Sequence, residues 1–190
     1  MASYSAWASR WRVPASYPVV VGYLYFADPE LRSIVLGAVM AALGLTVRAA
    51  AAGYLYKHQQ LARHGPYAFT RNPLYLGSTL IALGFVLAGT SWWGAFLVAA
   101  YLGLFYPVVI RREAEELRVR YGPAYEDHAR SVPLFFPRHS AHAVQLAKAG
   151  PGFSWEQYLS NREYQAGWGV LAGLGVLVLK LLWMRYMLMR

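Results

Sequence analysis

Long apolar runs separated by short polar segments are the main pattern along the chain. The runs cover residues 13–27, 31–56, 73–88, 94–110 and 167–188, and most charged residues fall between them. A soluble core cannot bury several apolar runs of about 20 residues, whereas a helix of that length spans a bilayer. The pattern therefore predicts an all-α integral membrane protein with about five transmembrane helices.

The third and fourth runs are predicted to form a tight helical hairpin. Residues 89–93 between them are small, polar or aromatic, and they are too few for anything but a turn between helices. A hairpin returns the chain to the side of the membrane from which it entered. The polar segments that flank the hairpin, 64–77 and 113–137, therefore meet on one side, where they are predicted to build a site.

The Lys and Arg residues of the loops predict the orientation. One side carries most of them: Arg10, Arg12, Lys57, Arg63, Arg71 and eight further residues within 111–165. The opposite side carries Arg32 and, after the last run, Arg185 and Arg190. Cytoplasmic loops of membrane proteins collect Lys and Arg. The N-terminus and both polar segments are therefore predicted to face the cytoplasm.

The composition supports a membrane protein and excludes several kinds of site. Hydrophobic residues make up 57% of the chain and charged residues 14%, with a net charge of +9. Because the positive charge is spread over the loops rather than gathered in one basic domain, it indicates topology, and no nucleic-acid partner is predicted. The chain has no cysteine, which excludes disulfides, a thiolate nucleophile and cysteine-ligated zinc or iron–sulfur centres. No metal site is predicted.

The segment 64–77 cannot be one regular helix, because Gly65-Pro66 and Asn72-Pro73 interrupt it. It therefore leaves backbone groups free near the membrane surface, and the helix predicted to begin at Pro73 presents N–H groups that suit a carboxylate or phosphate. Several side chains supply donors and aromatic faces around this point: His64, Tyr67, Arg71, Asn72 and Tyr75. For this segment alone, the alternative is a proline-rich interfacial loop without a ligand.

Three glutamates follow the exit of the fourth run and lie among several arginines. For Glu115 and Glu116, ion pairs on a solvated helix face are the expected role. Glu113 is nearest to the bilayer and is the most readily desolvated of the three, so its carboxylate is a candidate to hold an ammonium or sulfonium group. The alternative is that Glu113 belongs to the same solvated face.

Two motifs flank the hairpin. The first is GPYAFTRNPLYLG at 65–77, and the second is E-x-x-x-L-x-x-x-Y-G-x-x-Y at 113–125, followed by a Val-Pro…Pro ending. In this order, the motifs resemble those of the isoprenylcysteine carboxyl methyltransferase family and its phospholipid N-methyltransferase relatives. The members of these families are small multi-span membrane enzymes that use S-adenosylmethionine. The resemblance covers residues 63–138.

The resemblance implies an S-adenosylmethionine-dependent methyltransferase with a cytoplasmic cofactor pocket. It assigns the catalytic core to 63–138, while the pattern of apolar runs assigns a lead-in and two spans to 1–62 and a linker, an interfacial helix and the last span to 139–190. Arg71 and Glu113 are expected to lie nearest to the methyl transfer. The residues expected to line the cofactor site are His64, Gly65, Tyr67, Asn72, Pro73, Tyr75, Glu113 and Tyr125.

The chain departs from the family pattern at three positions. Asn72 stands where the family usually has a histidine, so no acid–base role is expected there. Ala114 stands where a second acidic residue is common, so Glu113 acts alone or with Glu116. His128 replaces a usual tyrosine, and its role is open.

The expected partners are the lipid bilayer and a lipophilic or small methyl acceptor, which could be a carboxylate, a thiol or an amine. Methyl transfer from a sulfonium to an anion needs mainly alignment and exclusion of water. Two alternatives remain: an NADPH-dependent membrane reductase of the sterol reductase type, and a non-enzymatic membrane scaffold.

Several local features carry their own expectations. Arg48 either snorkels toward the interface or pairs with an acidic group inside the bundle. Residues 139–152 are expected to be a linker, and Ser154 with Gln157 is expected to cap a short helix through Gln165. The GxxxG pattern at Gly169 and Gly173 favours close helix pairing, within the bundle or in a homodimer.

Overall fold

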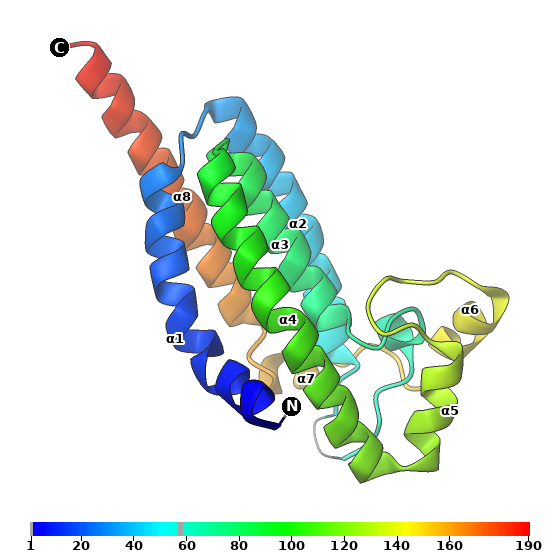
Figure 1. Ribbon diagram of the computed structural model, residues 1–190. Helices are drawn as coiled ribbons and strands as arrows, with labels where there is room; N and C mark the ends of the chain where they lie inside the picture. Colours follow the sequence, from blue (N-terminus) through cyan, green and yellow to red (C-terminus); the bar gives the residue numbers. More distant parts are fainter. Residues whose placement is uncertain (1, 57–58) are drawn as a thin grey trace. The chain divides into compact units, whose positions relative to one another are not determined.

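The computed structural model describes residues 2–56 and 59–190, and every regular element in that part of the chain is a helix (Figure 1). The all-α prediction is therefore confirmed. In chain order, the elements are α1 (Ala2–Phe26), α2 (Leu31–Gly53), the 3₁₀ helix η1 (Gly65–Ala68), α3 (Pro73–Gly89), α4 (Trp92–Tyr121), α5 (Pro123–Ser131), α6 (Ala141–Lys148), α7 (Trp155–Ser160) and α8 (Tyr164–Leu188).

Within the part of the chain that the structure describes, three helices are long and apolar enough to cross a membrane. They are α2, α4 and α8, with 23, 30 and 25 residues, while the apolar helix α3 has 17 residues. Membrane crossing is thus supported at three of the five predicted spans, and crossing by α1 and α3 stays a prediction. The cytoplasmic orientation also stays a prediction, and Lys57, which belongs to its charge count, lies outside the described residues.

The chain divides into two compact units. Unit 1 contains Met1–Leu43, Thr79–Arg112 and Trp168–Arg190, and therefore most of the apolar helices. Unit 2 contains Gly44–Ser78 and Glu113–Gly167, and therefore both polar segments singled out in the sequence.

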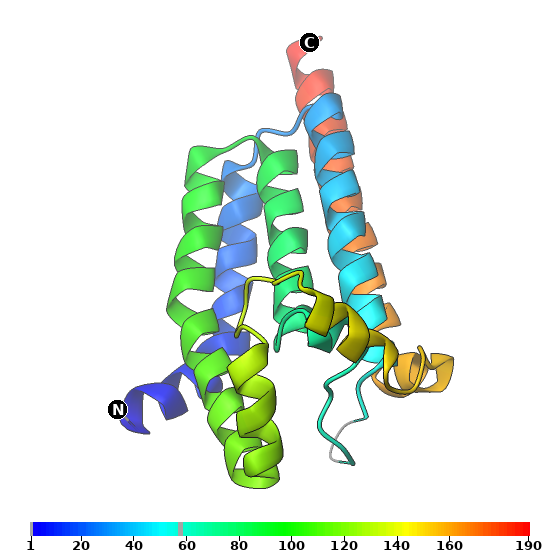
Figure 2. The same cartoon turned by 90° about the vertical axis from the view of Figure 1, so that its right-hand side faces the viewer.

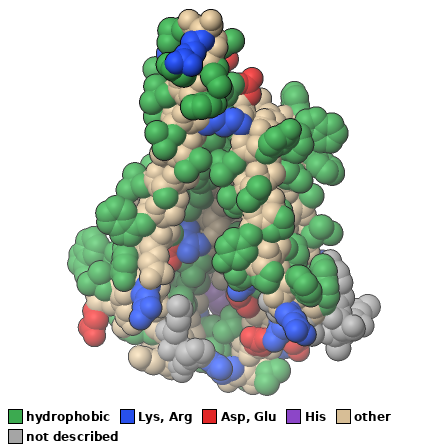
Figure 3. All heavy atoms as spheres, turned by 90° about the vertical axis from the view of Figure 1, so that its left-hand side faces the viewer, with side chains coloured by type: hydrophobic (Ala, Val, Ile, Leu, Met, Phe, Trp, Pro, Cys, Tyr) green, Lys and Arg blue, Asp and Glu red, His purple; other side chains and the backbone are tan. Residues whose placement is uncertain are grey.

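Unit 1 has a small core and a largely apolar surface. Its buried cluster consists of Tyr23, Ala27, Ile34, Ala88 and Leu177, which come from four parts of the chain. The parts of the helices that belong to this unit run side by side (Figure 2). Hydrophobic side chains point outward over the face shown in Figure 3. An outer surface of this kind suits contact with lipid rather than with water.

The predicted hairpin is present in unit 1. Helix α3 ends at Gly89 and α4 begins at Trp92, so the turn is as short as the sequence indicates. The turn is held by the segment after α1, because the Asp28 N–H donates to the Gly89 carbonyl (2.7 Å) and the Thr90 hydroxyl donates to the Asp28 carbonyl. The side chain of Trp92 is 91% exposed, as expected for an interfacial tryptophan.

One of the two glycines of the GxxxG pattern packs against another helix of the same chain. A Cβ atom on Gly173 would lie 2.6 Å from the ring of Phe85, so this glycine permits close packing between α8 and α3 within unit 1. Gly169 faces open space. Pairing in a homodimer stays a prediction.

Unit 2 contains the elements that the sequence predicted least well. Residues 139–152 are not a plain linker, because they include α6, whose N-cap Ser140 accepts a hydrogen bond from the Ala143 N–H (3.1 Å). This helix packs on η1. Its eight residues are too few to show a long apolar periodicity, and only the cap could have indicated it.

The helix after Ser154 begins as predicted but ends early. The Ser154 hydroxyl accepts from the Gln157 N–H (3.2 Å), yet α7 ends at Ser160 instead of continuing through Gln165. The reason lies in Asn161, whose side-chain amide donates to the carbonyls of Ala52 in the last turn of α2 and of Leu55 just after that helix (both 2.9 Å). These bonds hold a turn in place of another helical turn.

Arg48 pairs with an acidic group, which is the second of its two expected roles. Its Nε donates to the carboxylate of Glu163, which is 9% exposed, and its Nη1 donates to the Ser78 hydroxyl. Within unit 2, the ion pair therefore ties α2 to the residue just before α8, and the hydrogen bond to Ser78 ties α2 to α3.

Candidate active site

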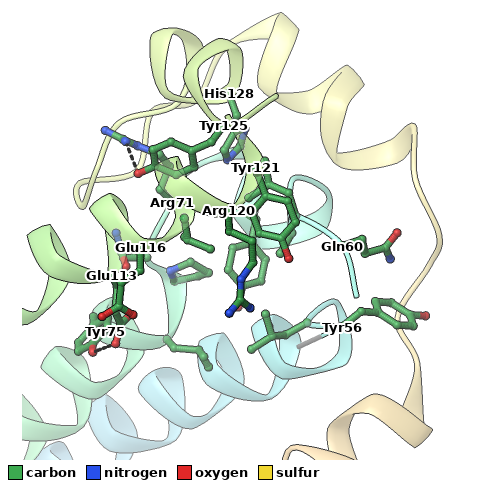
Figure 4. A pocket seen from close by; sticks show the side chains of 18 residues that line it. Tyr56, Gln60, Arg71, Tyr75, Glu113, Glu116, Arg120, Tyr121, Tyr125 and His128 are labelled. Atoms are coloured by element: carbon green, nitrogen blue, oxygen red, sulfur yellow. Dashed lines mark hydrogen bonds between the residues drawn. The ribbon is translucent and has the colours of Figure 1, made fainter. Parts of the chain in front are cut away.

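A cavity of about 430 Å³ lies in unit 2 (Figure 4). Its volume is in the range of sites that hold small molecules and cofactors. Its lining comes from the segment after α2, from η1 and the segment after it, from the start of α3, from the end of α4, and from α5: Leu55, Tyr56, Gln60, Leu61, Ala62, Tyr67, Arg71, Asn72, Pro73, Leu74, Tyr75, Glu113, Glu116, Leu117, Arg120, Tyr121, Tyr125 and His128.

Most residues predicted for the site line this cavity. Seven of the nine do so, and they come from both motifs: Tyr67, Arg71, Asn72, Pro73, Tyr75, Glu113 and Tyr125. His64 and Gly65 are not among the lining residues. The structure therefore brings the two motifs together, as the hairpin argument predicted.

Hydrogen bonds join the first motif to the segment after α5. The Arg71 N–H donates to the Pro133 carbonyl (2.9 Å), and the Arg138 N–H donates to the Phe69 carbonyl (3.0 Å). The Thr70 hydroxyl and the Asn72 amide add bonds to the carbonyls of Phe135 (2.7 Å) and Leu134 (2.8 Å). Asn72 is thus a positioning group in this structure, which agrees with its inability to titrate.

Two glycines allow the turns that aim the lining side chains. Gly65 has φ of +57°, a conformation that other residues rarely adopt, and Pro66 follows it at the start of η1. Gly122 has φ of +50° between α4 and α5, so that Tyr125 lies on a new helix and is buried. The glycines of the Gly-Pro and Tyr-Gly pairs in the motifs therefore contribute to the cavity through their backbone conformation.

His64 has a structural partner away from the cavity. Its Nδ1 lies 2.9 Å from the Leu146 carbonyl, which can only accept, so this nitrogen carries the proton. A Cβ on Gly150 would lie 2.2 Å from the His64 ring, so the ring packs closely on the chain after α6. In this structure His64 anchors α6 and is not among the residues that line the cavity, and its role in binding the cofactor stays a prediction.

Tyr75 and Glu113 form the acidic end of the cavity. The Tyr75 hydroxyl donates to Oε1 of Glu113 at 2.6 Å, and this bond connects α3 with α4. Glu116, one helical turn further, also lines the cavity. Glu115 instead pairs with Arg118 on the surface (2.7 Å), so the sequence prediction of a solvated ion pair holds for Glu115. Two carboxylates facing one cavity favour a positively charged ligand group.

Arg71 and Tyr125 lie next to this end (Figure 4). The Arg71 Nη1 donates to the Tyr125 hydroxyl at 2.9 Å, and the guanidinium carbon lies 5.7 Å from the centre of the Tyr125 ring. These contacts orient the guanidinium. Its Nε is buried, and the described residues offer it no hydrogen-bond partner. Arg71 therefore keeps one N–H donor for a ligand.

Two further buried groups lack partners among the described residues. They are the Tyr67 hydroxyl and both ring nitrogens of His128. Burial, together with the carboxylates of Glu163 and Glu113, raises the pKa of the Tyr67 hydroxyl above its usual range, so it stays a neutral donor. Burial and the positive charge of Arg71 lower the pKa of His128 to about 4, so its ring is neutral at pH 7.

Comparison with known proteins places these residues in a family. The model of the phospholipid methyltransferase family matches residues 19–124, which include the hairpin, the first motif and Glu113. The chain belongs to the phospholipid methyltransferase family. The resemblance stated from the two motifs is therefore confirmed at the level of this membrane methyltransferase group. Tyr125 and His128, which complete the cavity, lie just beyond the matched residues.

Two curated proteins are similar to this family member. It is 33% identical over 141 residues to the nickel-cobalt-cadmium resistance protein NccN of Alcaligenes xylosoxydans xylosoxydans, which covers 68% of this chain and 64% of that protein. It is 31% identical over 141 residues to the cobalt-zinc-cadmium resistance protein CzcN of Cupriavidus metallidurans, which covers 70% and 64%. The match thus spans a little less than two thirds of each relative. No solved structure matches the chain.

Sequence reasoning missed several lining residues of this phospholipid methyltransferase family member. Tyr56 and Gln60 lie in the connection after α2, which carries no motif, so nothing in the sequence marks them. Arg120 and Tyr121 lie within the second motif region, where the i to i+4 spacing of Glu116 and Arg120 suggested a surface pair. Their place in the lining follows from the turn at Gly122, which brings α5 back toward α4.

Proposed function

We propose that this protein is an S-adenosylmethionine-dependent methyltransferase that modifies a lipophilic or small acceptor at the cytoplasmic face of a membrane. The observation that carries the proposal is the cavity in which Glu113, Arg71 and Tyr125 of the two motifs meet. Family membership supports the reaction class. The names of the two similar proteins specify no methyl acceptor.

The chemistry of the lining fits the cofactor. S-adenosylmethionine carries two cationic groups, a sulfonium and an ammonium, together with a carboxylate. The carboxylates of Glu113 and Glu116 suit the cationic groups, and the free Nε–H of Arg71 suits an anionic group. The tyrosines of the lining supply flat faces and hydroxyl donors for the nucleoside.

The residues of the chain would act mainly by holding and aligning. When bound, the cofactor supplies an electrophilic methyl group on sulfur. The Tyr75 hydroxyl fixes the direction of the Glu113 carboxylate, and Tyr125 fixes the direction of the Arg71 guanidinium. Preorganised charges of this kind lower the barrier without rearranging during the reaction. A lipophilic acceptor would enter from the bilayer, while the water-soluble cofactor would enter from the cytoplasm.

The test is calorimetric titration of the detergent-purified protein with S-adenosylhomocysteine and, separately, with NADPH. We expect saturable binding of S-adenosylhomocysteine alone. Replacing Glu113 by alanine should weaken that binding about tenfold or more, because a charged hydrogen bond or ion pair is lost. Glu115→Ala is the matched control, since Glu115 lies on the same helix but pairs on the surface. Binding of NADPH alone would point to a reductase, and binding of neither ligand by folded protein would point to a scaffold.

A further inference from the structure

The loop between α5 and α6, together with α6, carries positive charge that no carboxylate offsets. From position 128 to position 155 the chain contains no Asp or Glu, although it contains Arg130, Arg138 and Lys148. Arg130 pairs with Asp127 (3.4 Å), whereas no ion pair joins Arg138 or Lys148 to a described residue. Both of these residues are exposed. Two uncompensated cations therefore lie on what is called below the 133–148 surface.

A large exposed aromatic residue lies beside these cations. Phe136 is 78% exposed and stands two positions before Arg138. Its ring meets the ring of Phe135 edge to face, with the ring centres 5.3 Å apart. On α6, Ala143 is buried while Lys148 is exposed, so the helix also turns a cation outward. An apolar ring next to basic side chains is typical of a segment that lies in a membrane interface.

Hydrogen bonds hold this loop beside the start of α3. They join residues 133–135 and 138 to residues 69–72 at donor–acceptor distances between 2.7 and 3.0 Å, and α3 begins at Pro73. The loop before α6 and the start of α3 accordingly lie side by side in both Figure 1 and Figure 2. Phe136 is therefore held next to the first turn of an apolar helix.

Helix α2 shows that this place is the end of a membrane-spanning segment. It is long and apolar enough to cross a membrane, and it ends at Gly53. Arg48, five residues before that end, donates through Nη1 to the Leu74 carbonyl in the first turn of α3 (3.4 Å). All of these residues belong to unit 2. The loop is therefore level with the last turns of a span, where the headgroup region of a bilayer begins.

We propose that the 133–148 surface docks on the anionic phospholipid headgroups of the leaflet at which α2 ends. Phe136 enters the boundary between headgroups and acyl chains, while the Arg138 guanidinium and the Lys148 ammonium bind phosphate groups. Anionic lipids are favoured over zwitterionic lipids because they give the bilayer surface a negative potential, which attracts basic residues next to a span. The inference goes beyond the proposed methyltransferase function and does not depend on it.

The composition of the surface fits a bilayer better than it fits a soluble polyanion. A bilayer offers apolar chains to Phe136 and phosphates to the cations at the same place, whereas a soluble polyanion leaves the ring in a polar contact. Proteins that bind nucleic acids strongly neutralise about 6–10 phosphates, which is more than two uncompensated cations can do. The position level with the end of α2 also brings the lipid within reach without a second protein.

A fluorescent label at position 136 tests the contact, because the chain has no native cysteine and Phe136→Cys creates a unique labelling site. The full chain, with an apolar environment-sensitive fluorophore in place of the ring, is reconstituted in vesicles that contain spin-labelled lipid as a quencher. One set is phosphatidylcholine, and the other is equal parts of phosphatidylcholine and phosphatidylglycerol. We expect quenching at least about twofold stronger in the mixed vesicles.

Val119→Cys provides the matched control for the label. Val119 is 81% exposed, and it lies on the charged end of α4, more than two helical turns beyond Ile110. A label at this position should not be quenched by the lipid in either set of vesicles.

Charge substitutions test the headgroup contact. In labelled Phe136→Cys, adding Arg138→Gln and Lys148→Gln should lower the quenching in mixed vesicles to the phosphatidylcholine level, since each basic residue near an anionic surface favours binding about fivefold. Raised salt should have the same effect because it screens the attraction. Arg185→Gln with Arg190→Gln removes the same charge at the far end of α8 and should change nothing. All four residues are exposed, and unchanged melting temperatures verify that the variants are folded.

Three results would overturn the proposal. Equal quenching at position 136 in the two sets of vesicles would show contact with lipid but no preference for anionic headgroups. Quenching by acrylamide in water without quenching by lipid would show that the loop stays in solvent. Protection from both quenchers would show that protein covers it. Because no readout uses S-adenosylmethionine, failure here leaves the methyltransferase proposal standing, and failure to bind S-adenosylhomocysteine leaves the 133–148 surface standing.

Discussion

The Tyr75 hydroxyl donates a 2.6 Å hydrogen bond to Oε1 of Glu113, and this bond joins the start of α3 to α4 across the acidic end of the cavity. The two residues are 38 positions apart, one from each motif. A carboxylate that accepts a hydrogen bond from a tyrosine keeps a defined direction. The bond therefore makes Glu113 a fixed negative charge facing the ligand cavity.

We first predict that Glu113 distinguishes a sulfonium from a thioether. Glu113→Gln should weaken binding of S-adenosylmethionine more than binding of S-adenosylhomocysteine, because only the first carries the sulfonium charge. Tyr75→Phe keeps the ring but removes the donor, so it should weaken both ligands by less than Glu113→Gln. Calorimetric titration with each ligand measures the differences. Equal losses for the two ligands in Glu113→Gln would show that this carboxylate does not face the sulfonium.

We next predict strong coupling between Arg48 and Glu163. Each is partly or fully buried, so removing one leaves an uncompensated charge, at a cost on the order of 3 kcal/mol of folding free energy. The double variant Arg48→Met/Glu163→Leu should therefore be more stable than either single variant. The apparent melting temperature in detergent is the readout. Additive losses in the double variant would mean that the pair contributes no coupling.

Tight packing in unit 1 gives a third prediction. A Cβ on Gly84 would lie 2.6 Å from the Gly37 carbonyl oxygen, so Gly84→Ala forces two helix backbones apart. We expect a clear fall in the apparent melting temperature. Gly175→Ala is the control on α8, where a Cβ meets nothing within 4 Å, and it should be neutral or stabilising because alanine favours helix. Similar behaviour of the two variants would contradict close packing at Gly84.

The buried state of His128 predicts a pH dependence of stability. Because the pKa of His128 is lowered to about 4 in the folded protein, the unfolded chain binds its proton first as the pH falls below about 6.5. Stability contributed by this residue is therefore present above that pH and declines between about pH 6.5 and pH 4, by on the order of 3 kcal/mol in total.

Melting temperatures of the purified protein at pH 7 and pH 5 measure this effect. Wild type should lose stability between these values, and His128→Phe should lose less, because its ring cannot take a proton. His142→Phe is the control and should keep the wild-type decline, since His142 is exposed. An identical decline in wild type and His128→Phe would assign the pH dependence to other groups.

Much of the fold was predictable because long helices carry a long-range apolar pattern. The hairpin turn at 89–93, the start of α3 at Pro73 and the cap at Ser154 were all predicted from local signals. Helix α6 was not, because its eight residues are too few to show an apolar periodicity. The early end of α7 was not, because it depends on contacts with distant residues. For α7, the decisive contacts run from Asn161 to the carbonyls of Ala52 and Leu55.

The residues of the candidate site also divide into those that the sequence predicted and those whose contacts only the folded chain establishes. The motifs identified Tyr67, Arg71, Tyr75, Glu113 and Tyr125 as a group, because the hairpin between them has a defined length and returns the chain to one side. The contact of His64 with the Leu146 carbonyl was not predictable, since only the folded chain brings that carbonyl to its ring. The partner of Arg48 was left open for the same reason, because Glu163 is 115 residues away.

The amino-acid sequence by itself determined the all-helical class, the apolar hairpin and the pairing of the two polar motifs, since these follow from periodicity, run length and local backbone chemistry. Only the tertiary structure decided which polar side chains have partners in the protein and which are left for a ligand. His64 and Asn72 are used by backbone carbonyls, while His128 and Nε of Arg71 are buried without partners among the described residues. Hydrogen bonding and desolvation depend on distances between residues far apart in the chain, and one sequence does not contain those distances.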